Sequence, residues 1–186
     1  MRSAEFNETR REVIYQVSGT VLEIGFGSGY NLPFYKDVTK LYALDPSTEL
    51  FAYAKDRISS VSFPVEYLQN SAENIPLEDN SIDAVVSTWS LCSIPDLSRA
   101  LQEIKRVLKS DGRFYFIEHG QSPKRINSMV QKFFTQVSRH FTGNCHLDRK
   151  MDDFIADSGL IIESIEMLPE EGRPLMFSYQ GVALKK

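Results

Sequence analysis

The sequence contains few of the residues that form disulfide bonds or bind metal ions. Its 186 residues include two cysteines, Cys92 and Cys145, and three histidines. Two cysteines in apolar or mixed surroundings are typical of a reduced chain rather than of a disulfide scaffold. His140 and His146 flank Cys145. Even with Asp148 added, this local set is smaller than a zinc ion requires, so no metal site is expected.

Long apolar runs and an excess of positive charge are also missing. Nowhere do about eighteen apolar residues run together, as a spanning helix requires, and residues 1–5 lack the apolar core of a signal peptide. The 21 basic and 25 acidic residues give a net charge of −4, which offers no overall footprint for a polyanion. We therefore expect a cytoplasmic protein without a nucleic-acid partner, which contacts a membrane at most peripherally.

The apolar content suffices for one core. With 42% apolar residues, a chain of 186 residues can bury a sizeable core but is too short for two ordinary domains. It contains no repeat, low-complexity tract or linker. The expectation is a single domain over residues 1–186.

Short aliphatic runs alternate with helical patterns along the first two thirds of the chain. Such alternation with short turns predicts parallel strands joined by helical crossovers. The last third has a different pattern, two helices followed by two strands that fit a hairpin at one edge. The predicted fold is a Rossmann-like α/β three-layer sandwich, whose seven-stranded sheet is mostly parallel with an antiparallel edge strand. The expected strands are 20–24, 41–44, 63–68, 82–86, 113–117, 160–167 and 175–183, and the expected helices are 5–17, 48–59, 96–109, 123–141 and 148–158.

A glycine-rich turn follows the first predicted strand and precedes a helical stretch. Residues 23–29 have the pattern E-x-G-x-G-x-G. Glycines there let a ligand lie against bare main chain, and a helix start supplies free N–H donors. The spacing of dinucleotide sites would place the third glycine at Tyr30, which disfavours a nicotinamide oxidoreductase. Asp45 ends the next strand, where it could accept the hydroxyls of a ribose, so we favour a nucleotide-like ligand over a purely structural turn.

Several segments resemble class I S-adenosylmethionine-dependent methyltransferases, and the resemblance covers nearly the whole chain. The segments with this resemblance are V-L-E-I-G-F-G-S-G at 21–29, L-D-P at 44–46, 71–87 and 103–119. Shorter motifs are similar to small methyltransferase-like proteins that include thiol S-methyltransferases, and more loosely to phospholipid N-methyltransferases and quinone C-methyltransferases. These motifs are N-L-P-F-Y at 31–35, L-C-S-I at 91–94 and F-I-E-H at 116–119.

The resemblance implies S-adenosylmethionine as the cofactor. Ser71 stands where many relatives carry an acidic residue that accepts from the adenine amino group, and Glu73 is the alternative acceptor. Carried over by position, the resemblance implies a cofactor site made of Glu23, Gly25, Phe26, Gly27, Gly29, Asp45, Pro46, Ser71, Ala72 and Ser87.

The methyl acceptor is expected beyond the ends of the fourth and fifth strands. In-line methyl transfer requires alignment of the acceptor and exclusion of water, and no universal catalytic residue. Trp89, Leu91 and Phe133 are the predicted walls, with core packing as the alternative for Trp89. His119 follows the fifth strand and is the candidate base, oriented by Glu118. The alternative for His119 is a hydrogen bond to a neighbouring loop.

The predicted helix 123–141 is amphipathic, and all of its charges are basic. One interpretation packs its apolar stripe on the sheet and leaves the charges as a solvated face. The other is an interfacial helix or lid that admits an apolar or lipid-like acceptor. The stripe is Ile126, Met129, Val130, Phe133, Phe134, Val137 and Phe141, and the charges are Lys124, Arg125, Lys132 and Arg139.

The sequence thus predicts a methyltransferase that acts on a small, apolar or lipid-like thiol or amine. One alternative is a phospholipid or amine N-methyltransferase at a membrane surface. An alternative from another class is a catalytically silent cofactor-binding scaffold or sensor.

Overall fold

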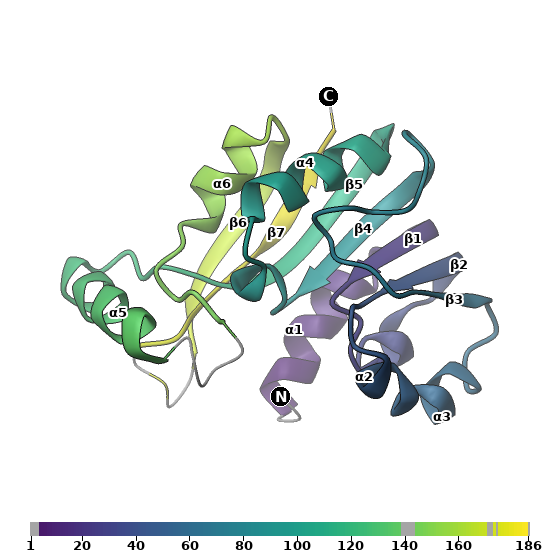
Figure 1. Ribbon diagram of the computed structural model, residues 1–186, viewed down its shortest axis with the longest axis horizontal. Helices are drawn as coiled ribbons and strands as arrows, with labels where there is room; N and C mark the ends of the chain where they lie inside the picture. The colour runs from purple at the N-terminus through teal and green to yellow at the C-terminus, as the bar shows by residue number, and fades with distance from the viewer. Residues whose placement is uncertain (1–3, 139–143, 171–172, 174, 186) are drawn as a thin grey trace.

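The fold is a three-layer α/β sandwich, as predicted. The computed structural model describes residues 4–138, 144–170, 173 and 175–185. In this part of the chain, seven strands form one sheet in the order β3-β2-β1-β4-β5-β7-β6 (Figure 1). The strands are β1 (Ser18–Ile24), β2 (Asp37–Leu44), β3 (Val65–Leu68), β4 (Ile82–Thr88), β5 (Leu108–His119), β6 (Ile161–Pro169) and β7 (Phe177–Leu184).

The sheet is parallel from β3 to β5, and the late hairpin supplies its antiparallel edge. β7 pairs antiparallel with both β5 and β6, so it lies one position in from the edge, which β6 occupies. β5 begins at Leu108, five residues before the predicted start, because Leu108 already pairs with Ile82. The helical pattern of the preceding segment concealed this pairing.

Helices cover both faces of the sheet. α1 (Ala4–Ile14), α2 (Thr48–Ala52) and α3 (Lys55–Ile58) lie on one face, whereas α4 (Leu97–Val107) and α6 (Met151–Asp157) lie on the other. Successive side chains of a strand point to opposite faces. Val21 accordingly packs in the apolar cluster of α1, and Leu22 packs in that of α4. One short strand thus contributes to both halves of the core.

Two predicted helices differ from the structure. The helix expected over 48–59 is divided into α2 and α3. Residues 25–36, all of them described, contain only the 3-10 helix η1 (Leu32–Phe34), and the α-helix expected after the glycine turn is absent there. The Asn31 amide donates to Glu23 at 3.0 Å, which holds the chain close to β1 where a helix would lead away. The expected row of free N–H donors at a helix start is therefore wrong for this turn.

The helix α5 (Arg125–Ser138) points three side chains of its apolar stripe outward, contrary to the interpretation that packs the stripe on the sheet. Ile126, Met129 and Phe133 are 77%, 66% and 70% exposed, whereas the polar Gln131 is fully buried. The interpretation that these three side chains pack on the sheet is wrong. The side chains of Phe134 and Val137, and residues 139–143 with them, lie outside the part of the chain that the structure describes.

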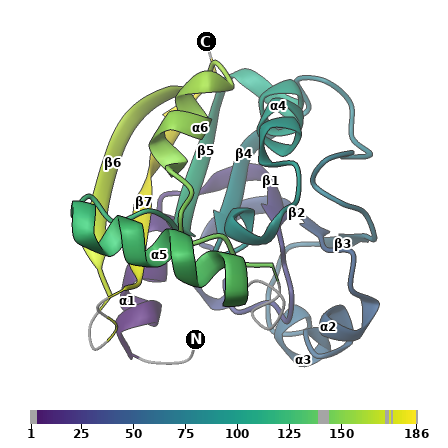
Figure 2. The same cartoon turned by 60° about the vertical axis from the view of Figure 1, so that its left-hand side comes forward.

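Gln131 explains this orientation. Its side-chain oxygen accepts from the Ser122 N–H at 2.7 Å, and its amide donates to the carbonyls of Gly120 at 3.1 Å and Leu175 at 2.9 Å. Buried main-chain groups require such partners, so one glutamine fastens the helix with its polar face inward. Figure 2 shows α5 crossing in front of β6 and β7, clear of the two helical layers.

Truncation of Phe133 should hardly change stability. At an exposed site, Phe133→Ala should alter the free energy of unfolding by less than about 0.5 kcal/mol. Phe116→Ala, the matched control, removes a fully buried ring and should cost about 3–5 kcal/mol in urea denaturation. A loss of several kcal/mol for Phe133→Ala would place that ring in a core and contradict the exposed face.

Candidate active site

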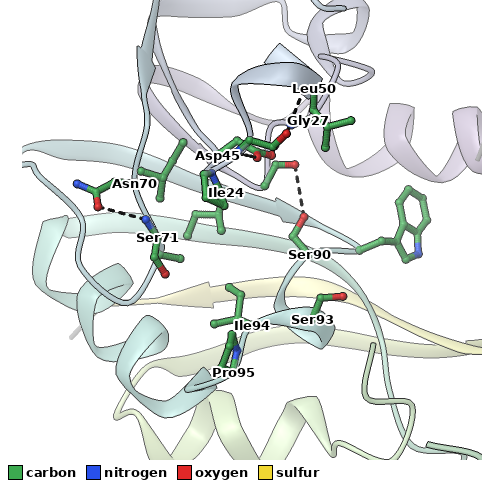
Figure 3. A pocket seen from close by; sticks show the side chains of 16 residues that line it. Ile24, Gly27, Asp45, Leu50, Asn70, Ser71, Ser90, Ser93, Ile94 and Pro95 are labelled. Carbon is green, nitrogen blue, oxygen red and sulfur yellow. Dashed lines mark hydrogen bonds between the residues drawn. The ribbon is translucent and has the colours of Figure 1, made fainter. Parts of the chain in front are cut away.

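An opening lies at the carboxyl ends of β1, β2 and β4. β1 stands between β2 and β4, so the chain leaves the sheet in opposite directions on its two sides. Ligands of open α/β sheets bind at this kind of reversal. A cavity of about 470 Å³ is found there, and Figure 3 shows Asp45 and Gly27 across it from Ile94 and Pro95. This volume suits a nucleoside-sized ligand.

Two glycines shape the wall after β1. Gly25 has φ +64°, and a Cβ there would lie 2.0 Å from the Ser90 hydroxyl oxygen. Gly27 has φ +55°, but a Cβ there would meet only a carbonyl oxygen at 3.9 Å. Gly25 is therefore required by packing against the loop after β4, while Gly27 leaves bare main chain facing the cavity.

Asp45 connects the glycine turn to the end of β2. Its carboxylate accepts from the N–H groups of Gly27 and Ser47, each at 2.8 Å, and the residue is 6% exposed. Each carboxylate oxygen has room for two donors. Asp45 can therefore hold the turn and still accept from hydroxyl groups of a ligand, the role predicted for it.

Ser71 and Ser90 lie at opposite ends of the cavity (Figure 3). Ser90 is at the end that packs against the glycine turn. The Ser71 hydroxyl donates to Glu73 at 2.7 Å, and Glu73 also accepts from the Asp96 N–H at 2.7 Å. Glu73 is thus engaged by the loop before α4 and does not line the cavity. Asn70, the second residue after the end of β3, does line the cavity and was missed. Its position just beyond a strand end was the available signal.

The structure brings most of the predicted cofactor residues together. Glu23 and Phe26 line an adjoining cavity that shares Gly25 and Gly27. Gly29 lies outside both cavities, packed against Leu32 and Phe26. The predicted residues that line the main cavity are Gly25, Gly27, Asp45, Pro46, Ser71, Ala72 and Trp89, and those that the sequence analysis missed include Leu50, Asn70, Ser93, Ile94 and Pro95.

Glu23 is buried below the glycine turn. It accepts from the Tyr35 hydroxyl at 2.7 Å and from the Asn31 amide at 3.0 Å. Burial raises the pKa of Glu23 to about 7, although both hydrogen bonds and the nearby Arg10 guanidinium oppose the shift. Arg10 reaches the same group through Asn31, to which it donates at 3.0 Å. Glu23 therefore supports the turn from beneath.

Glu118 organises the loop after β4. It is fully buried and accepts from the Ser87 hydroxyl at 2.6 Å and from the N–H groups of Ser90 and Cys92 at 3.1 and 3.3 Å. Burial raises the pKa of Glu118, and these donors oppose the shift. Ser87 is thus occupied by Glu118, and Leu91 packs in the core beside α4. Neither residue lines the cavity.

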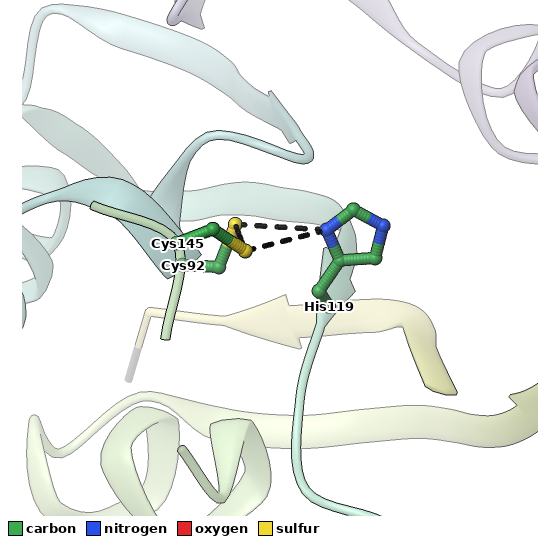
Figure 4. Close-up of side chains that lie close together, drawn as sticks. All are labelled: Cys92, His119 and Cys145. Atoms are coloured by element: carbon green, nitrogen blue, oxygen red, sulfur yellow. Dashed lines mark hydrogen bonds between the residues drawn. The ribbon is translucent and has the colours of Figure 1, made fainter. Parts of the chain in front are cut away.

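His119 lies behind the cavity wall. Its Nε2 is 3.1 Å from the Glu170 carboxylate, and its Nδ1 is 3.8 Å from the sulfurs of both Cys92 and Cys145 (Figure 4). Burial alone would lower the pKa of His119, but the facing Cys92 and Glu170 raise it to about 9. The sequence analysis paired His119 with Glu118 and missed Glu170, which lies 51 residues away in the chain.

Trp89 both lines the cavity and packs against the interior. The residue is 8% exposed and has φ +51°, unusual for a side chain of this size. Its ring meets Phe6 edge-on with centroids 4.9 Å apart, and Arg10 lies 4.7 Å above it. The predicted cover for a bound ligand and its core-packing alternative thus coexist. Phe133, the third predicted wall residue, lies on α5 outside the lining of the cavity.

The comparison with protein families agrees with the geometry. The family described as "Methyltransferase domain" matches residues 22–116, just over half of the chain, and the chain belongs to this family. The matched range runs from β1 into β5, and it includes the glycine turn, Asp45 and the loop after β4. The match shows that the chain carries a methyltransferase domain, for which S-adenosylmethionine is the expected cofactor.

Curated relatives include proteins named for different acceptors. A thiol S-methyltransferase of Rattus norvegicus is 33% identical over 138 residues, 70% of this chain and 55% of that protein. A phosphatidylethanolamine N-methyltransferase of Cereibacter sphaeroides is 28% identical over 154 residues, 81% of this chain and 75% of that protein. The chain thus spans little more than half of the rat relative.

Solved structures share the fold. The YcgJ protein of Bacillus subtilis aligns with a TM-score of 0.78 and 17% identity, covering 97% of this chain and 99% of that one. A geranyl diphosphate methyltransferase in complex with S-adenosylmethionine aligns with a TM-score of 0.75 and 15% identity, covering 98% and 85%. At these identities the likeness confirms the sheet architecture.

Removal of the Asp45 carboxylate should weaken cofactor binding. Asp45→Ala loses a charge-assisted acceptor for the ribose and the anchor of the Gly27 N–H, and hydrogen bonds to charged groups contribute about 1.5–3 kcal/mol each. Calorimetry with S-adenosylmethionine and its demethylated product should show at least roughly a tenfold loss. Asp56→Ala, on the exposed side of α3, is the matched control. Unchanged affinity in Asp45→Ala would mean that the ribose is held elsewhere.

Glu23 should make the protein less stable as the pH rises from about 4.5 to about 7. In this window the unfolded chain releases the proton of Glu23, while burial retains it in the folded chain, whose pKa is about 7. Unfolding therefore becomes easier, by up to about 3 kcal/mol. Denaturation of Glu23→Gln should show a flatter pH dependence than the wild type. Glu78→Gln, which removes an exposed carboxyl, is the control, and identical slopes for all three proteins would refute the buried proton.

Proposed function

We propose that this methyltransferase acts on a small apolar or lipid-like acceptor, a thiol or an amine, which it takes from an anionic membrane surface. The observation that carries the proposal is the outward apolar face of α5, formed by Ile126, Met129 and Phe133. Exposed apolar side chains on one helix face are typical of interfacial helices. None of the described helices is long and apolar enough to cross a bilayer.

The basic side chains in and next to α5 favour an anionic surface as the partner. Lys124, Arg125 and Lys132 are exposed, and residues 121–147 contain no acidic side chain, although the whole chain has a net charge of −4. Basic residues next to inserted apolar side chains attract anionic headgroups. The apolar face and the positive charge therefore favour the same partner.

The position of α5 supports delivery of the acceptor to the cavity. α5 follows β5, which is parallel to β4, and β4 is parallel to β1. The carboxyl ends of these strands therefore share one edge of the sheet, where the cofactor cavity lies. An acceptor that enters from a surface beneath α5 would approach the wall formed by Trp89 and Ser90.

The chemistry demands little of the side chains beyond alignment. When bound, S-adenosylmethionine supplies an electrophilic methyl group. The glycine turn and Asp45 hold the cofactor in place. Trp89, which lines the cavity, excludes water from the bound cofactor. The names of the relatives, one a thiol S-methyltransferase and one a phosphatidylethanolamine N-methyltransferase, support a thiol or an amine as the acceptor class.

Methyl transfer in vesicles tests the acceptor class. The protein is incubated with labelled S-adenosylmethionine and phosphatidylglycerol vesicles that contain either phosphatidylethanolamine or a long-chain alkyl thiol. Label in either extracted lipid supports the proposal and identifies N- or S-methylation. Cofactor binding without label in either acceptor would instead support the silent scaffold, and transfer only to water-soluble thiols would exclude the membrane as the source.

Charge reversal in α5 and at the residue just before it should weaken membrane binding. Lys124→Glu with Lys132→Glu should weaken binding to phosphatidylglycerol vesicles by roughly 30-fold or more, because each cation near an anionic surface contributes about 1 kcal/mol. Wild-type binding in a sedimentation assay should fall with added salt. Cofactor affinity should stay unchanged in the variant.

The matched control is Lys36→Glu with Lys55→Glu. Both lysines are exposed and lie outside α5, and the two double variants carry the same net charge. The control should retain vesicle binding. Equal losses in both double variants would show that overall charge, rather than α5, determines binding.

A further inference from the structure

We propose that Cys92, His119 and Cys145 form a binding site for one zinc-class divalent cation. The site goes beyond the proposed function and does not depend on it. The ligand atoms would be the two sulfurs and the Nδ1 atom of His119. Figure 4 shows both sulfurs facing the same edge of the imidazole ring. No other described side chains form such a cluster of potential ligands.

The distances fit a tetrahedral ion. The sulfurs are 3.4 Å apart, and each lies 3.8 Å from Nδ1. Zinc binds sulfur at about 2.3 Å and imidazole nitrogen at about 2.0–2.1 Å. At tetrahedral angles, two sulfur ligands are then about 3.8 Å apart, and sulfur and nitrogen about 3.5 Å. Shifts of a few tenths of an ångström would suffice for all three ligands to bind one ion.

The three ligands come from separate parts of the chain. Cys92 lies in the 3-10 helix η2 (Leu91–Ser93), His119 ends β5, and Cys145 follows 26 residues later. Cys92 and Cys145 are the chain's two cysteines, and His119 is one of its three histidines. The fold therefore gathers both thiols and one of the three imidazoles of the chain in one largely buried place. The expectation of no metal rested on the residues near Cys145 in sequence, and this proposal replaces it.

Glu170 provides the partner that metal-binding histidines usually have. Its carboxylate lies 3.1 Å from Nε2 of His119 and also accepts from the Ser178 hydroxyl at 2.8 Å. When an ion takes the Nδ1 position and displaces its proton, the remaining ring proton stays on Nε2, which faces Glu170. Glu170 therefore favours the tautomer that an ion requires.

A bound ion would fasten the cavity wall. The His146 N–H donates to the Cys92 carbonyl at 2.8 Å, and Arg149 donates to the carbonyls of Leu91 and Ile94, each at 2.8 Å. Residues 144–149 are thus already hydrogen-bonded to the loop after β4. Ser93, Ile94 and Pro95 of this loop line the cofactor cavity. Coordination by Cys92 and Cys145 would add a bond between these two segments. The expected consequence is tighter cofactor binding in the loaded protein.

The proposal excludes two other roles. A ligand Nδ1 cannot accept the acceptor's proton, so His119 would not be the predicted base. A disulfide between Cys92 and Cys145 would also use the 3.4 Å sulfur contact. A disulfide would not explain why Nδ1 lies at equal distances from both sulfurs. It would also not explain why the buried Glu170 lies behind the ring.

Cobalt and zinc binding test the site directly. The reduced wild-type protein should bind one equivalent of Co²⁺ with thiolate-to-cobalt absorption, which one equivalent of Zn²⁺ should displace. Cys92→Ser, Cys145→Ser and His119→Gln should each reduce the affinity at least 100-fold. Glu170→Gln, which retains all three ligands, should reduce it about 10- to 100-fold. His146→Gln, next to Cys145 but outside the cluster, is the matched control and should keep wild-type affinity.

A measurement on the wild type keeps the test valid if the variants do not fold. Because the chain has two cysteines, a thiol-reactive disulfide reagent reports on this cluster alone. One equivalent of Zn²⁺ should slow the modification of both thiols at least tenfold. Unchanged thiol reactivity with zinc, an absence of cobalt absorption in the reduced protein, or wild-type cobalt binding by His119→Gln would each overturn the proposal.

Discussion

The hydrogen bond from the Gly27 N–H to the Asp45 carboxylate joins the ends of two adjacent parallel strands, and the cofactor cavity depends on it. Parallel strands bring their carboxyl ends to one edge, but the turns that follow them are free to diverge. Asp45 prevents this divergence by accepting from Gly27 and Ser47 while it remains at the cavity surface. The same carboxylate thereby shapes the site and offers acceptor atoms to a ligand.

Buried carboxylates repeat this arrangement at neighbouring strand ends. Glu23 supports the turn after β1, and Glu118, at the end of β5, accepts from main-chain groups of the loop after β4. Glu170 plays the corresponding part behind His119. Each carboxylate loses hydration on burial and regains hydrogen bonds from donors on another segment. Hydrogen bonds from separate segments therefore connect the loops that form the walls of the cavity.

The local sequence pattern predicted the structure correctly where the residues of a segment by themselves allow few conformations. The strand β1 and its glycine turn were predicted because an aliphatic run and closely spaced glycines have few structural solutions. The turn's companion Asp45 followed from the rule that parallel strands end at one edge. Boundaries were less accurate where the cause lay on another strand, as at Leu108, whose pairing with Ile82 begins β5 early. The short 3-10 helix after the turn likewise depends on the contact of Asn31 with Glu23.

The sequence by itself determined the layered α/β fold, the cofactor turn and the basic, amphipathic character of α5. Only the tertiary structure decided which face of α5 points outward, because Gln131 satisfies main-chain groups of residues 120, 122 and 175, which no helical periodicity encodes. It also decided the environment of His119. Cys92, Cys145 and Glu170 are separated from it by 27, 26 and 51 residues, and their convergence follows from the order of strands in the sheet and the loops that it supports.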